Sequence, residues 1–62
     1  MPNLFDDRAV PLLDQIAAAE RELKMRQHVY PRRIAEKKMT QALADRETAA
    51  MAAIVETLKG LV

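Results

Sequence analysis

The side chains of this sequence that could do chemistry are few, and their spacing does not favour catalysis. His28 is the only histidine and no cysteine accompanies it, so a cysteine–histidine metal site is excluded. Serine is absent, and a single glycine leaves no glycine-rich phosphate loop. Asp6 and Asp7 fall in a short N-terminal segment, and Glu20 and Glu22 would point to different sides of a helix. We therefore predict a protein that is not an enzyme and needs no metal or cofactor.

Positive charge gathers in the middle of the chain. From Lys24 to Lys38 there are six lysines and arginines against one glutamate, whereas the whole chain carries only +1. Three interpretations remain open: a solvated helix face, a contact surface for an acidic protein partner, or a nucleic-acid-binding tip. The near-neutral total and the single aromatic residue of the segment weigh against nucleic acid. The candidate partner-binding residues are Arg26, Tyr30, Arg32, Arg33, Lys37 and Lys38.

These residues lie on a predicted helix that spans residues 11–36, after a flexible arm at 1–10. Pro11 suits the first helical position, where its missing N–H would have no partner anyway. Alternating steps of four and three residues place one stripe on a single face of this helix. The stripe consists of Leu12, Ile16, Ala19, Leu23, Arg26 and Tyr30.

Pro31 leaves two possibilities for this helix. Proline lacks an N–H and crowds the carbonyl of Gln27, so the helix either continues through a kink to about Glu36 or stops near Val29. The apolar phase favours continuation, because Ile34 keeps the same stripe. Tyr30 beside the proline is either a contact residue or a structural one whose hydroxyl meets the carbonyl that Pro31 leaves free.

A second helix is predicted over residues 41–59, after a turn at 37–40. Thr40 is a suitable N-cap, and Gly60 is a suitable stop. The expected inward stripe of this helix is Ala44, Glu47, Met51, Ile54, Leu58 and Leu61. Because Arg26 and Glu47 both fall on otherwise apolar stripes, they either pair across the hairpin or reach its rim and stay solvated.

The expected fold is all-α, a single antiparallel two-helix hairpin. A chain of 62 residues buries too little surface for a private core, so we expect two copies to close a four-helix bundle. The expected dimer core consists of Leu12, Ile16, Leu23, Ile34, Met51, Ile54 and Leu58. The N-terminal residues lack the pattern of a signal peptide and no stretch is long enough to span a membrane, so a cytoplasmic protein is expected.

Several residues give the chain a resemblance to a known family. The segments Glu22-Leu23-x-Met25-Arg26-x-x-Val29-Tyr30-Pro31-Arg32, Lys38-Met39-Thr40, Ala44-Asp45-x-Glu47 and Met51-x-Ala53-Ile54, with Leu58, resemble very small phage- and prophage-encoded proteins. That family includes the anti-quorum-sensing protein of Pseudomonas phages. The resemblance covers about residues 12–59. It departs from the family pattern at Arg33, where an apolar residue is expected, and at Lys37, where glycine is expected.

The resemblance implies a homodimeric helical hairpin that binds and disables host proteins. The targets it implies are a LuxR-type quorum-sensing activator, bound at its DNA-binding domain, and the ATPase that drives pilus assembly. Two other classes remain open: a small dimeric nucleic-acid-binding regulator that uses the basic segment, and a minor phage structural protein.

Overall fold

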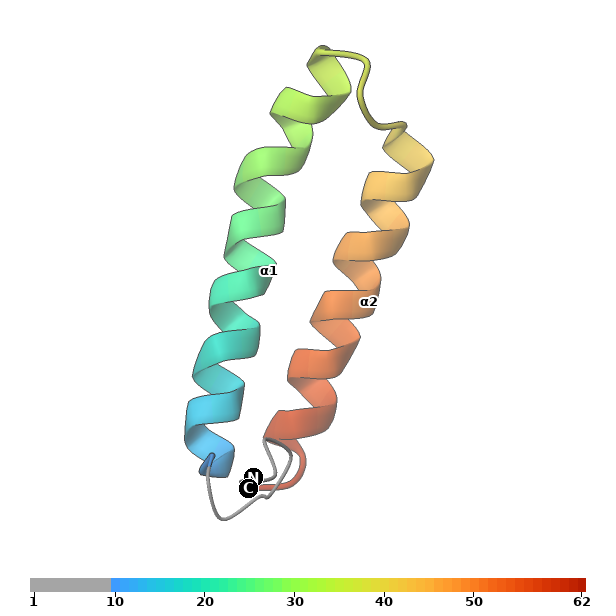
Figure 1. Ribbon diagram of the computed structural model, residues 1–62. Coiled ribbons are helices and arrows are strands. Elements are labelled where there is room, and N and C mark those ends of the chain that lie inside the picture. Colours follow the sequence, from blue (N-terminus) through green and yellow to red (C-terminus); the bar gives the residue numbers. More distant parts are fainter. Residues whose placement is uncertain (1–9) are drawn as a thin grey trace, which may run out of the picture.

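The chain folds into two antiparallel α-helices that lie side by side. The computed structural model describes residues 10–62, so most of the expected N-terminal arm lies outside the described residues. Helix α1 spans Leu12–Ala35 and α2 spans Gln41–Lys59, against 11–36 and 41–59 expected. Figure 1 shows the end of α2 beside the start of α1, with the connection between them at the far end of the molecule. The expected all-α hairpin is confirmed.

Helix α1 passes through Pro31 without a break. It remains α-helical to Ala35, so the possibility that it stops near Val29 is wrong. Packing explains why the helix tolerates the proline. Tyr30 and Ile34, on either side of Pro31, are both half-buried, while Pro31 itself is exposed. Contact with α2 therefore extends past the proline and holds the last turn in helical conformation.

The connection between the helices begins with a left-handed residue. Lys37 has φ of 61°, the conformation that usually falls to glycine after a helix. The N–H of Lys38 donates to the carbonyl oxygen of Arg33 at 2.9 Å, and the N–H of Lys37 donates to that of Ile34 at 3.0 Å. These two bonds form a Schellman motif, which satisfies the last carbonyls of α1. A lysine thus occupies a position that glycine would fill with less strain.

The two ends of α2 differ in how they are stabilised. At its start the Thr40 hydroxyl oxygen accepts a hydrogen bond from the N–H of Leu43 at 3.1 Å, which confirms the predicted N-cap. At its end Gly60 has φ of −67° and stays in right-handed conformation. The helix ends at Lys59 with Gly60 as its C-cap, as expected, and the N–H of Gly60 still donates to the carbonyl oxygen of Glu56 at 3.0 Å.

The contact between the helices is thin and contains small residues. Its buried members are Ile16 and Ala19 from α1, and Ala44 and Val55 from α2. On α1 the predicted stripe faces α2, and all of its residues are buried or half-buried. Alanines on both sides let the two helices approach closely, but they remove little apolar surface from water.

The stripe on α2 differs from the prediction at three positions: Thr48 and Val55 take the places of Glu47 and Ile54, and Leu61 lies beyond the helix and is exposed. Val55 is only 4% exposed and Ile54 is 48% exposed, so Ile54 does not face α1. The observed spacing runs Ala44, Thr48, Met51, Val55 and Leu58, in alternating steps of four and three. Of the residues expected in the dimer core, Leu12, Ile16, Leu23, Ile34, Met51 and Leu58 are buried or half-buried within the single hairpin.

The left-handed residue of the connection leads to a stability prediction. Lys37→Gly removes the Cβ that makes a positive φ costly, so it should stabilise the fold by about 1 kcal/mol. For a domain of this size, that gain raises the melting temperature by roughly 4–8 °C. Thermal denaturation followed by circular dichroism measures the change.

The matched control is Lys37→Ala, which removes the same charge but keeps a Cβ at this position. Its melting temperature should not rise. Equal gains in the two variants would show that the lysine charge, and not the backbone conformation, destabilises the connection.

Candidate protein-interaction surface

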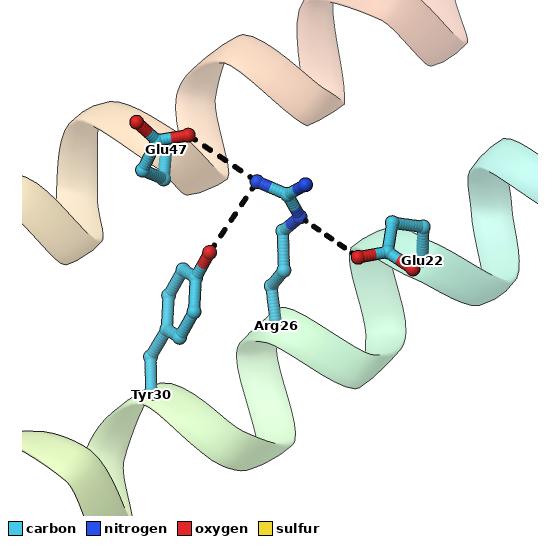
Figure 2. Close-up of polar contacts among 4 residues, drawn as sticks. All are labelled: Glu22, Arg26, Tyr30 and Glu47. Atoms are coloured by element: carbon cyan, nitrogen blue, oxygen red, sulfur yellow. Dashed lines mark hydrogen bonds and ion pairs between the residues drawn. The ribbon is translucent and has the colours of Figure 1, made fainter.

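A cluster of polar side chains bridges the two helices on one side of the hairpin. Arg26 lies at its centre, and Figure 2 shows its guanidinium reaching towards residues of both helices. Its Nε donates to Glu22 Oε1, and its Nη1 donates to Tyr30 Oη and Glu47 Oε2, each at 3.3 Å. Of the two possibilities left open for Arg26 and Glu47, pairing across the hairpin is therefore observed, and both side chains remain partly exposed.

The same contacts correct the expectation for Tyr30. Its hydroxyl accepts from Arg26, so its partner is a guanidinium and not the carbonyl that Pro31 leaves free. The reason is geometric: positions 26 and 30 are one helical turn apart and lie on the same face of α1.

The cluster contains two carboxylates and one guanidinium, so it has an excess of negative charge. Partial burial acts to lower the pKa of Arg26, but the Tyr30 hydroxyl, the hydrogen bond to Glu22 and the carboxylate charges outweigh it and raise that pKa above its ordinary value. Arginine is protonated throughout the physiological range in any case. The contact distances lie at the long end for charge-assisted hydrogen bonds, so water competes with them.

An apolar groove lies beside the cluster, towards the connection. Its volume is about 370 Å³, and it brings together three of the predicted partner-binding residues, Arg26, Tyr30 and Arg33. The rest of its wall is Glu22, Met25, Val29 and Met39. The site residues predicted from the sequence do not include Met25, Val29 or Met39. A second stripe on α1, at positions 18, 22, 25 and 29, is the sequence signal that could have indicated the first two.

The last turn of α1 and the start of the connection carry four of the predicted contact residues, which we call the basic elbow: Arg32, Arg33, Lys37 and Lys38. All four are exposed. Lys38 Nζ pairs with Glu36 Oε2 at 3.1 Å. Lys37 and Lys38 also line a second shallow groove with Met39 and Leu43. The two grooves share Met39, so the basic elbow and the apolar groove form one continuous surface.

Large exposed apolar side chains continue this surface along both helices. We call them the apolar face: Met25 and Val29 on α1, and Leu43 and Ile54 on α2. Met25 is 59% exposed, and the other three range from 37% to 48%. Leu43 and Ile54 belong to the α2 stripe 43, 47, 50 and 54, and Glu47 of that stripe reaches Arg26 beside Met25. Both halves of the apolar face therefore lie on the side of the hairpin that carries the Arg26 cluster.

The opposite side of the hairpin carries polar contacts, together with the exposed Leu13 near the start of α1. Lys59 Nζ pairs with Glu20 Oε2 across the two helices at 3.6 Å. Gln41 Nε2 donates to Asp45 Oδ1 at 2.8 Å along α2. The cluster of apolar side chains on both helices lies on the side of Arg26, so that side is suited to a further apolar contact.

Two other properties concern the described part of the chain. Within residues 10–62, neither helix is long and apolar enough to cross a membrane. No group of three or more histidine, aspartate or glutamate side chains in this range is placed to hold a metal ion.

No family model, no curated protein and no solved structure matches this sequence. The family resemblance described above therefore depends on the quoted residues alone.

The contact between Arg26 and Glu47 leads us to predict that substitutions at these two positions have coupled effects on stability. Arg26→Met and Glu47→Gln should each lower the melting temperature, and the double variant should lose little more than Arg26→Met alone. The reason is that the first substitution already removes the interaction that the second one disrupts. Thermal melts of the wild type, both single variants and the double variant measure this coupling.

The control cycle combines Arg26→Met with Glu20→Gln, whose carboxylate contacts Lys59 on the opposite side. The changes in melting temperature caused by Arg26→Met and Glu20→Gln should be additive. Additive losses in the Arg26–Glu47 cycle would contradict the contact in Figure 2.

Proposed function

We propose that this chain is a small dimeric interaction protein, encoded by a phage or prophage, that binds and inhibits a protein of its bacterial host. The observation that carries the proposal is the continuity between the apolar face and the basic elbow. The apolar face is suited to contact with another copy of the chain, and the basic elbow is suited to contact with an acidic surface of a different protein.

The apolar face supports dimerisation. The buried residues of the hairpin are one isoleucine, one valine and two alanines, which is a small core for a folded domain. Meanwhile Met25, Val29, Leu43 and Ile54 stay in contact with water. Covering them with the same face of a second copy would form a four-helix bundle, the usual way in which helix pairs bury a second stripe.

The basic elbow supports recognition of a protein partner. The Schellman motif and the Thr40 N-cap hold the backbone of the connection, so the four cations are presented from the end of α1 and an ordered turn. Ordered cations steer association with acidic surfaces and can form close ion pairs there. Met39, which lines both grooves and lies outside the apolar face, adds an apolar contact for the partner beside these cations.

The family resemblance supplies the identity of the target. A LuxR-type quorum-sensing activator is the first candidate, and the pilus-assembly ATPase is the second. Binding of nucleic acid by the basic elbow is the alternative function, and a structural role in the phage particle is another. The apolar side chain of Met39 beside the basic elbow favours a protein over a phosphate backbone, because phosphates need donors and cations along the whole contact.

Dimerisation gives the first functional prediction. Sedimentation equilibrium at micromolar concentration should show a species of twice the 7.0 kDa chain mass. Ile54→Asp should shift it to the monomer, because an aspartate in the covered face would be left without a cation. The control is Ala53→Asp, which places the same charge on the adjacent exposed residue, away from both helix contacts. A folded wild-type monomer, or equal effects of the two variants, would contradict the proposed dimer.

The basic elbow gives the second functional prediction. Replacing Arg32 and Arg33 together by glutamate should abolish binding to the purified host activator, because reversed charges repel an acidic surface. The melting temperature of the double variant should fall by a few degrees at most, since substitutions of exposed residues usually change the free energy of unfolding by about 0.5 kcal/mol. Surface plasmon resonance measures the binding.

The control reverses Arg21 and Lys24, which changes the net charge equally on an exposed part of α1 outside the elbow. Full binding by the elbow variant would refute the proposed contact surface. DNA binding that weakens steeply with salt, with no affinity for the activator, would support the nucleic-acid alternative instead.

A further inference from the structure

The two halves of the hairpin carry opposite charge. The half that contains the basic elbow, residues 24–50, has seven lysines and arginines against three acidic residues. The other half, residues 10–23 and 51–62, contains the free ends of both helices and has four acidic residues against two basic ones. We call this second half the open end. The hairpin therefore has a positive elbow and a negative open end, about 36 Å apart for a helix of 24 residues.

We propose that a second copy docks on the apolar face with its hairpin reversed, so that each basic elbow lies over the open end of its partner. This inference rests on the proposed dimer and adds its orientation. Face-to-face pairing of two identical hairpins allows two symmetric arrangements. If the two-fold axis runs parallel to the helices, the two basic elbows lie at the same end of the bundle. If the axis runs across the helices, each basic elbow lies beside the open end of the other copy.

Side-chain charge distinguishes these two arrangements. Neighbouring helices are antiparallel in both, so the helix macrodipoles favour neither. Packed helices lie about 8–10 Å apart, which is close to the Debye length of about 8 Å at physiological salt, so charges on adjacent copies still interact. Joining the elbows would set two strongly positive halves together and two negative halves together. The reversed arrangement places a positive half against a negative half at both ends.

The size and shape of the face suit this docking. Two helices, each about 10 Å wide and about 28–36 Å long, present a flat area of roughly 600 Å², which approaches the ~800 Å² per partner of a stable interface. Ala50 lies at the midpoint of α2, on the stripe that contains Leu43 and Ile54, and it is exposed. In the reversed arrangement the symmetry axis passes near this alanine, whose small side chain lets the two α2 helices approach closely.

The reversed arrangement has a consequence for the proposed function. It places the two basic elbows at opposite ends of the bundle, so both remain open to solvent. One dimer could then hold two host molecules without a clash between them. Elbows that meet at one end would instead compete for the same space.

Spin labels can test the orientation, because the sequence contains no cysteine and single cysteines can be introduced without background. Lys38→Cys places a label at the elbow, on an exposed side chain. Pulsed electron–electron double resonance on the Lys38→Cys homodimer should give a distance of about 36 Å between the two labels, close to the length of α1. A mixed dimer of Lys38→Cys and Lys59→Cys chains should give a distance of less than about 20 Å.

A label near mid-height, at Ala49→Cys, is the control, since both arrangements bring these labels to a similar short distance. A short elbow-to-elbow distance, with the Ala49 signal present, would overturn the reversed orientation while leaving the dimer intact. Loss of the dipolar signal at all positions, together with a monomer mass in sedimentation, would instead refute the proposed dimer itself.

Discussion

A helix pair can bury only one stripe of each helix, and this constraint governs the rest of the molecule. The stripe in contact here contains small residues at several positions, with Ala19 facing α2 and Ala44 facing α1. Such a contact brings the backbones close but removes little apolar surface from water. Other large apolar side chains stay exposed, and four of them, Met25, Val29, Leu43 and Ile54, lie together on one side of the hairpin, whereas Leu13, Leu61 and Val62 are exposed elsewhere. The apolar face is thus a direct result of having only two helices.

The Arg26 cluster lies at the edge between the buried stripe and the apolar face. Its guanidinium contacts α1 through Glu22 and Tyr30, and α2 through Glu47. A polar bridge of this kind favours one register of the two helices over others, because a shift along the helix axis would separate the charges. The same register determines which apolar residues border the groove. Structural specificity and the candidate binding surface therefore depend on the same four side chains.

At the basic elbow, a strained backbone conformation coincides with an additional positive charge. Glycine at position 37 would relieve the left-handed conformation, yet the chain has a lysine there. The lysine adds to a cluster of cations at the end of α1, where positive charge also interacts favourably with the helix dipole. Retaining strain at an exposed position is common where side chains contact a partner. The proposed contact with an acidic protein surface gives this lysine such a role.

The sequence by itself determined the local features of this protein. Helical periodicity indicated both helices, and the Thr40 cap indicated the start of α2. These signals depend on residues within about one helical turn of each other, so they can be read along the chain.

Tertiary structure decided the features that join distant residues. Ile54 and Val55 are both apolar, and only packing against α1 shows that Val55 is buried. The continuation of α1 through Pro31 likewise depends on its contact with α2. The pairing of Arg26 with Glu47, and the groove shared by Val29 and Met39, depend on the register of the two helices. No neighbouring residue encodes that register, because it follows from the fit of two whole helix surfaces.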